Sequence, residues 1–104
     1  MSSAFGPFRL LACGTLLEGE RMVPLTPKEE AVLRALVAAA GRRVSKDELV
    51  AAGWGDDAAV SDASVARAVH TLRRKLGAAG RDDGCVRTSY ARGYQLAVPV
   101  ERLG

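Results

Sequence analysis

The sequence predicts a small α+β domain in which short strands come first, three helices follow, and a β-hairpin lies near the end. Short apolar runs separated by glycine fill the first quarter of the chain. Two helix-start signals and a long amphipathic segment fill the middle, and two apolar segments flank a glycine-containing turn further on. With 104 residues, the chain is long enough for one such domain and too short for two.

Two or three short strands are expected between Phe8 and Val23. The apolar runs there are divided by Gly14 and by the turn-forming Glu18-Gly19-Glu20 segment. Short runs punctuated by glycine are typical of small antiparallel sheets. We therefore expect an N-terminal sheet over about residues 5–24.

The first helix is predicted over about residues 28–40. Thr26 can cap its start, Pro27 suits the first helical position, and Glu29 completes a capping box three residues after the cap. Apolar residues then recur at helical spacing until Gly41, which ends the pattern.

Two further helices follow. The segment Ser45–Glu48 repeats the capping box, so it predicts a short second helix with Gly53 as its end. Ser61 or Asp62 offers the cap of the third helix, which runs to about Leu76.

The third helix is predicted to have an apolar side and a basic side. At 3.6 residues per turn, one narrow stripe contains Val65, Val69, Leu72 and Leu76. The opposite side contains Arg67, His70, Thr71 and Arg74. Positive charge also gathers in this part of the chain: residues 1–63 hold seven Lys or Arg against nine Asp or Glu, and residues 64–104 hold eight against three. An anionic partner would therefore meet the later part.

Segments Cys85–Thr88 and Tyr94–Val98 are expected to pair as a β-hairpin, with Pro99 after its second strand. A short helix, a turn and a longer basic helix, followed by a hairpin, form a winged helix-turn-helix whose longer helix fits the major groove of DNA. Its basic side would then face base edges or phosphates, and Arg92 at the hairpin tip would reach the adjacent minor groove or its phosphates.

No catalytic or metal centre is expected. His70 is the single histidine, and Cys13 and Cys85 lack metal-ligand spacing, so we expect two reduced thiols and no cofactor. No nucleophile triad, phosphate loop or carboxylate pair stands out. Apolar runs stay far below the roughly 18 residues of a membrane span, and the start does not resemble a signal peptide. We expect a cytoplasmic protein that is not an enzyme.

Four segments together resemble the winged-helix effector domain of the OmpR/PhoB response-regulator family. They are LTPKEEAVLRAL, VSKDELVAAGWG, SVARAVHTLRRKLG and VRTSYARGYQL, in this order, and they cover about Leu25 to Leu96. The preceding strands are similar to that family's N-terminal sheet. The resemblance implies one winged-helix domain over residues 1–104, with the helices and wing at about 25–98. It also implies sequence-specific binding of double-stranded DNA in a two-component transcription regulator.

The expected DNA-binding residues lie on the second helix, the third helix and the wing. They come from the basic side of the third helix and from the family resemblance. The family's base-reading positions fall on Ala66, Arg67, His70 and Thr71, and its backbone contacts on Lys46, Trp54, Arg73 and Thr88. The basic side adds Arg74, and the wing adds Tyr90 and Arg92. Trp54 is equally interpretable as a lid on the core.

This chain departs from the family in several places. Glu30 stands where many relatives carry an aromatic residue, which predicts looser packing against the sheet unless the side chain faces out. Tyr90 stands where the wing often carries arginine. Ala66 and Ala68 replace a polar pair, which leaves Ala66 only a contact with a thymine methyl group.

Other hypotheses remain open at this stage. The basic side of the third helix could be a solvated surface. The domain could bind a protein such as RNA polymerase through the loop from Trp54 to Ser61, or regulate an attached enzyme such as a uroporphyrinogen-III synthase-like protein. The family's usual arrangement implies two protomers on direct-repeat DNA.

Overall fold

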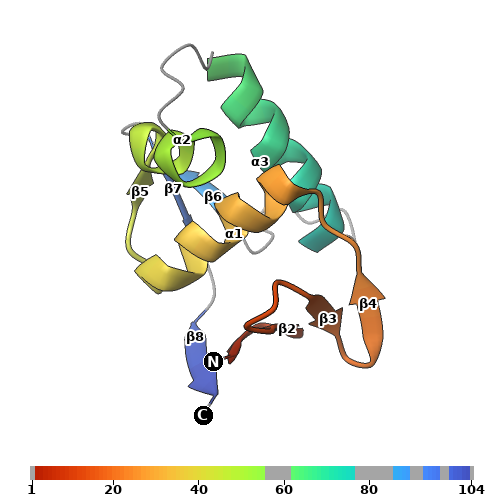
Figure 1. The fold of residues 1–104 in the computed structure, drawn as a ribbon. Coiled ribbons are helices and arrows are strands. Elements are labelled where there is room, and N and C mark those ends of the chain that lie inside the picture. The colour runs from red at the N-terminus through yellow and green to blue at the C-terminus, as the bar shows by residue number, and fades with distance from the viewer. Residues whose placement is uncertain (1, 56–61, 77–85, 90–92, 97–98, 104) are drawn as a thin grey trace.

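The computed structural model describes residues 2–55, 62–76, 86–89, 93–96 and 99–103. The elements in Figure 1 are β1 (Ser2–Phe5), β2 (Phe8–Leu10), β3 (Leu16–Glu18), β4 (Arg21–Val23), α1 (Pro27–Ala39), β5 (Val44–Ser45), α2 (Lys46–Trp54), α3 (Asp62–Leu76), β6 (Val86–Ser89), β7 (Gly93–Leu96) and β8 (Val100–Leu103). The predicted order of strands, three helices and a hairpin is confirmed.

The N-terminal sheet has five strands in the order β4-β3-β2-β1-β8, and all neighbours are antiparallel. Its first four strands form a meander: β2, β3 and β4 confirm the strands expected between Phe8 and Val23, whereas β1 was not expected. The fifth strand was not expected: the chain continues beyond Pro99, and β8 pairs with β1, with Phe5 opposite Val100. The N-terminal strand β1 and the C-terminal strand β8 therefore lie side by side (Figure 1), and the sheet spans more of the chain than residues 5–24.

Helix α1 begins as predicted. The Thr26 hydroxyl accepts a hydrogen bond from the Glu29 backbone N–H at 3.2 Å, and the Glu29 carboxylate accepts one from the Thr26 N–H at 2.9 Å. The helix ends at Ala39 because Ala40 adopts a left-handed conformation (φ 51°) and its N–H donates to the Val37 carbonyl at 3.0 Å.

Ala40→Gly is expected to raise the free energy of unfolding by about 0.5–1 kcal/mol. A side chain in the left-handed region costs roughly 1–2 kcal/mol, and the greater freedom of glycine in the unfolded chain offsets part of the gain. Urea denaturation measures the change. Ala38→Gly is the control, since Ala38 is exposed inside α1 and glycine there should lower stability by about 1 kcal/mol. Loss of stability in both variants would contradict the expectation.

Helices α2 and α3 follow their predicted starts. The Ser45 hydroxyl accepts from the Glu48 N–H at 3.1 Å, which completes the second capping box. Gly53, the predicted end of α2, lies inside the helix, and Gly55 caps it with φ 65°. Helix α3 begins at Asp62 and ends at Leu76; Ser61 lies outside the described residues.

The core fixes how α3 sits on the rest of the domain. The predicted apolar stripe of α3 is buried: Val65, Val69, Leu72 and Leu76 are each 5% exposed or less. They join buried side chains of α1 and α2 in one cluster, including Leu33, Leu36 and Leu49. Helix α3 packs against α1, α2 and β6 through this buried stripe.

The second sheet has the order β5-β7-β6 and contains the hairpin. Its two-residue strand β5 was not predicted. Gly93 pairs with Ser45, and a Cβ at Gly93 would lie 2.7 Å from the Val44 carbonyl oxygen. Gly93 has no positive φ, so the close approach of β5 explains glycine at this place, and not a turn conformation as the sequence suggests.

Candidate nucleic-acid interface

The side of α3 that faces away from the core carries exposed residues. Ala66, Arg67, His70 and Arg74 are all exposed. Within the described part of the chain, the side chains of Arg67, His70 and Arg74 form no ion pair or hydrogen bond. Two guanidinium groups and an imidazole are therefore open to solvent on a helix whose opposite side is fixed in the core. We call this set of four residues the exposed face of α3.

Thr71 and Arg73 lie at the two borders of this face. Thr71 is half-buried, and its hydroxyl lies 3.1 Å from the Ala68 carbonyl oxygen, to which it donates. Arg73 is half-buried and already interacts within the chain. The exposed face is thus narrower than the basic side expected from the sequence.

Residues of α2 flank this surface. Lys46, at the first turn of α2, is half-buried and interacts within the chain. Trp54, at the last turn, packs against the core cluster while staying half-exposed. The Lys28 ammonium lies 5.0 Å from the centre of the Trp54 ring and donates to the Gly53 carbonyl at 2.5 Å. Trp54 therefore covers part of the core, which agrees with its interpretation as a lid.

The wing is described in part. Thr88 lies on β6, opposite Tyr94 of β7. Tyr94 is half-buried against the core. Tyr90 and Arg92, the predicted wing contacts, lie outside the described residues, as does the loop at residues 56–61.

A buried acidic residue behind α3 was not anticipated. Glu29 is only 2% exposed, although the sequence assigned it nothing beyond helix capping. Its carboxylate also accepts a hydrogen bond from the Lys75 ammonium of α3 at 2.5 Å. Burial by itself would raise the pKa of Glu29, but hydrogen bonds from the Lys75 ammonium and the Thr26 backbone N–H outweigh it and lower the pKa below its ordinary value of 4.5.

Acid is expected to remove the stability that Glu29 contributes. A carboxyl with a lowered pKa in the folded state stabilises the fold above its unfolded pKa and loses this contribution as pH falls through the folded pKa. The loss should start near pH 4.5 and continue below it. Urea denaturation of wild type and Glu29→Gln at pH 7 and pH 3 is the measurement. The variant's free energy of unfolding should lie below that of wild type by less at pH 3 than at pH 7. An equal difference at both pH values would contradict the expectation.

Glu30 stands where many family members carry an aromatic residue, and it makes a polar contact there. It is half-exposed, and its carboxylate pairs with the Arg34 Nε at 3.2 Å. Arg34 in turn donates to the Ala12 carbonyl at 2.9 Å, in the connection between β2 and β3. A Cβ at Gly14 would lie 2.6 Å from the Glu30 carboxyl group, so glycine permits this close approach. The hydrogen bond from Arg34 to Ala12 thus links α1 to the five-stranded sheet.

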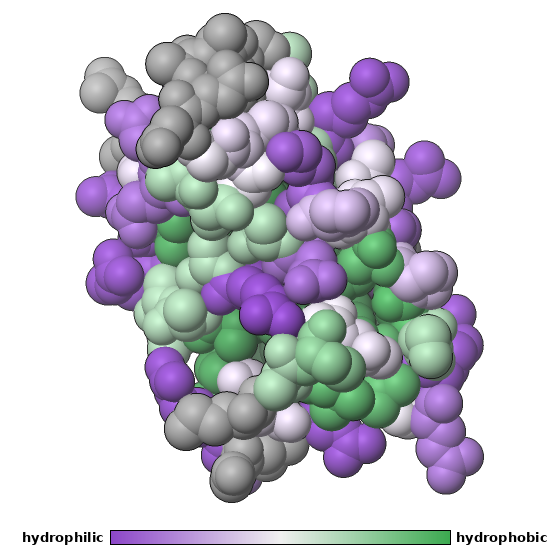
Figure 2. Space-filling view, in the orientation of Figure 1, coloured by the Kyte–Doolittle hydropathy of each residue, from purple (hydrophilic) through white to green (hydrophobic). Residues whose placement is uncertain are grey.

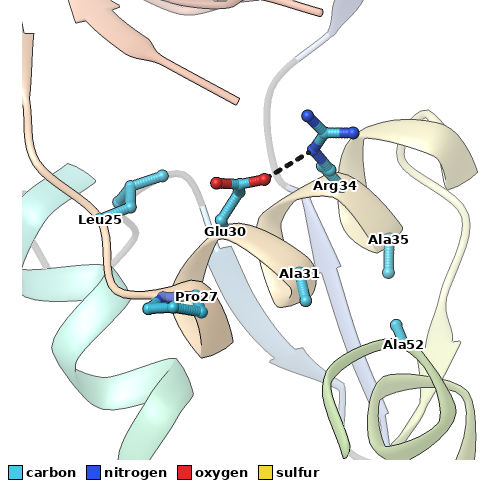
Figure 3. A pocket seen from close by; sticks show the side chains of 7 residues that line it. All are labelled: Leu25, Pro27, Glu30, Ala31, Arg34, Ala35 and Ala52. Atoms are coloured by element: carbon cyan, nitrogen blue, oxygen red, sulfur yellow. Dashed lines mark ion pairs between the residues drawn. The ribbon is translucent and has the colours of Figure 1, made fainter. Parts of the chain in front are cut away.

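The side of α1 that carries Glu30 and Arg34 also borders a cavity of about 450 Å³ (Figure 3). It is lined by Leu25, Pro27, Glu30, Ala31, Arg34, Ala35 and Ala52. The Glu30–Arg34 ion pair lies at one side and the small alanine side chains at the other. Figure 2 shows hydrophobic surface over α1 and α2, with hydrophilic side chains around it. Within the described residues, no cluster of His, Cys, Asp or Glu could hold a metal ion, and no helix is long and apolar enough to cross a membrane.

Comparison with protein families identifies the chain. The family model described as "Transcriptional regulatory protein, C terminal" matches residues 19–96. The chain belongs to this family. The OmpR/PhoB-type resemblance is thereby confirmed, and the family is one of DNA-binding effector domains of transcription regulators rather than of enzymes.

Two relatives illustrate the match. The transcriptional regulator HilA of Salmonella typhi is 41% identical over 96 residues, which cover 92% of this chain and 17% of HilA. The response regulator protein GraR of Staphylococcus aureus is 31% identical over 84 residues, which cover 81% of this chain and 37% of GraR. The chain thus spans only about a sixth of HilA and just over a third of GraR.

Solved structures confirm the winged-helix fold. The DNA-binding domain of Escherichia coli CadC has a TM-score of 0.81 at 24% identity, over 96% of this chain and 94% of that domain. The Klebsiella pneumoniae RstA DNA-binding domain, solved in complex with its RstA box, has a TM-score of 0.75 at 24% identity, over 92% and 96% of the two chains. The OmpR/PhoB homolog DrrB of Thermotoga maritima has a TM-score of 0.80 at 24% identity, over 91% of this chain and 43% of DrrB.

Proposed function

We propose that this domain binds specific sequences of double-stranded DNA by placing α3 in the major groove. The observation that carries the proposal is the exposed face of α3, whose cationic side chains are unpaired within the described residues while the opposite stripe is buried. A helix held in this way presents its free side to the groove without ordering a flexible segment first.

Each expected contact has a role in this proposal. Arg67 and His70 donate hydrogen bonds to base edges, and the Ala66 methyl group contacts a thymine methyl group. Phosphates are contacted by Arg73 and Arg74 of α3, by Lys46 and Trp54 of α2, and by Thr88 of β6. Tyr90 and Arg92 of the wing contact the minor groove or its phosphates.

The affinity for DNA is expected to fall steeply with salt. Four to six phosphate contacts per protomer would release as many condensed counterions, so the slope of log affinity against log salt should be about −4 to −5. Titrating a labelled duplex at several salt concentrations measures the slope. A slope near zero would contradict phosphate binding.

A mobility-shift assay at low salt with duplexes of mixed sequence tests the proposal itself. A DNA-binding domain retards these duplexes, and selection from a random pool then yields its target sequence. No retardation would overturn DNA binding and favour a protein-binding winged helix.

We also propose that the chain folds as one domain and acts in the cytoplasm without enzymatic activity. On direct-repeat DNA, two protomers bind the two half-sites, as the family resemblance implies. Contact with RNA polymerase is the corresponding expectation for the loop from Trp54 to Ser61. Sedimentation with a two-half-site duplex should give two protomers per duplex, whereas one protomer per duplex would contradict the dimer.

A further inference from the structure

A polar junction behind the exposed face joins α1 to α3. The Glu29 carboxylate and the Lys75 ammonium are 46 positions apart in sequence and 2.5 Å apart in space. The Glu29 side chain is 3% exposed and that of Lys75 is 31% exposed. The Lys75 ammonium comes from the last turn of α3, so the contact joins α1 to the C-terminal end of that helix.

The same carboxylate also fixes the start of α1. Glu29 accepts a hydrogen bond from the Thr26 N–H at 2.9 Å and completes the capping box. One buried group thus connects the N-terminal turn of α1 to the C-terminal half of α3, and its position is set from both sides.

Apolar packing alone would leave this orientation less well defined. Burial of the α3 stripe is non-directional and tolerates small rotations or shifts along the helix axis. Hydrogen bonds to a buried carboxylate are directional, and an unpaired charge at this place would be costly. A shift of about 1 Å is enough to spoil contacts between side chains and base edges, because hydrogen bonds weaken steeply outside their preferred geometry.

We propose that Glu29 and Lys75 are positioning residues that set the rotation of α3, so that its exposed face meets the bases in register. This inference rests on the proposed DNA binding. It assigns the Lys75 ammonium to the Glu29 carboxylate instead of to a phosphate.

Glu29→Gln tests the proposal without removing the helix cap, since glutamine also completes a capping box. The affinities for the selected duplex and for a scrambled duplex are measured well below the unfolding temperature. We expect the ratio of the two affinities to fall about tenfold, the worth of one base contact. Glu48→Gln is the matched control, because Glu48 has the same capping role in α2 but is exposed. Its ratio should stay within about twofold, since it changes no contact to α3.

Variants at Lys75 separate positioning from phosphate contact. Lys75→Met should reproduce the loss of the affinity ratio seen in Glu29→Gln and leave the salt slope unchanged. Lys75→Arg keeps the cation and should therefore keep most of the wild-type ratio between the affinities for the selected and the scrambled duplex. A phosphate contact would instead give equal loss on both duplexes and a salt slope smaller by about 1, which would overturn the proposal.

A measurement without DNA separates failure of this inference from failure of DNA binding. Amide resonances along Asp62–Leu76 should shift in Glu29→Gln and stay in place in Glu48→Gln. Unchanged α3 resonances in Glu29→Gln would overturn the positioning role even if wild type binds DNA. If wild type retards no duplex but the α3 resonances shift, the junction orients α3 and the proposed DNA binding is what fails.

Discussion

Replacing Glu29 by alanine is expected to lower the free energy of unfolding by about 3 kcal/mol. Loss of the capping interaction accounts for about 1 kcal/mol. Loss of the charge-assisted hydrogen bond from Lys75, whose ammonium then lacks its partner in a half-buried place, accounts for about 2 kcal/mol more. Lys75 is exposed enough to turn toward water, which keeps the total below that of a fully buried pair. Urea denaturation followed by circular dichroism measures the change.

Glu48→Ala is the matched control for this expectation. Glu48 stands at the same position of the second capping box, and its side chain is exposed. Its removal should cost about 0.5–1 kcal/mol. Equal losses in the two variants would mean that capping explains the effect and that the buried ion pair adds nothing.

The parts of the fold that the sequence predicts are those encoded within a few residues. Both capping boxes depend on a side chain and a backbone group three positions apart, and the Thr26 and Ser45 caps are confirmed. The apolar stripe of α3 depends on helical periodicity and is confirmed by its burial. Gly53 misleads because glycine is tolerated inside a helix, and the cap with positive φ is Gly55, two residues later.

The parts that escape prediction depend on distant segments. Strand β8 pairs with β1 across almost the whole chain, and its short Val100–Leu103 segment carries no local signal for that partner. Strand β5 has two residues and exists only through its pairing with β7. Such strands are stabilised by their neighbours more than by their own propensity.

The junction behind α3 was missed for a related reason. Glu29 has a complete local explanation as the capping residue, so nothing in the sequence calls for a second role. A signal was nevertheless present: Glu29 lies on the same side of α1 as Val32, Leu33 and Leu36, which are buried. A charge on an apolar side requires a partner, and a cation at the flank of the α3 stripe supplies it.

The exposed face of α3 makes Arg67 the residue whose loss should affect recognition most. Arg67 is exposed and forms no ion pair or hydrogen bond within the described residues, so its replacement should leave the fold intact. A guanidinium that donates two hydrogen bonds to a base edge contributes about 1–3 kcal/mol to discrimination between bases. Arg67→Ala should therefore weaken binding to the selected duplex by about 5- to 150-fold and change binding to a scrambled duplex little.

Two arginine variants serve as controls for this measurement. Arg9→Ala removes the same charge from an exposed position on β2, in the five-stranded sheet, and should leave both affinities nearly unchanged. Arg73→Ala should weaken binding to both duplexes by a similar factor, because a phosphate contact carries no sequence information. If Arg67→Ala also weakens both duplexes equally, Arg67 contacts the backbone, and the base edges must be read by other residues of the exposed face.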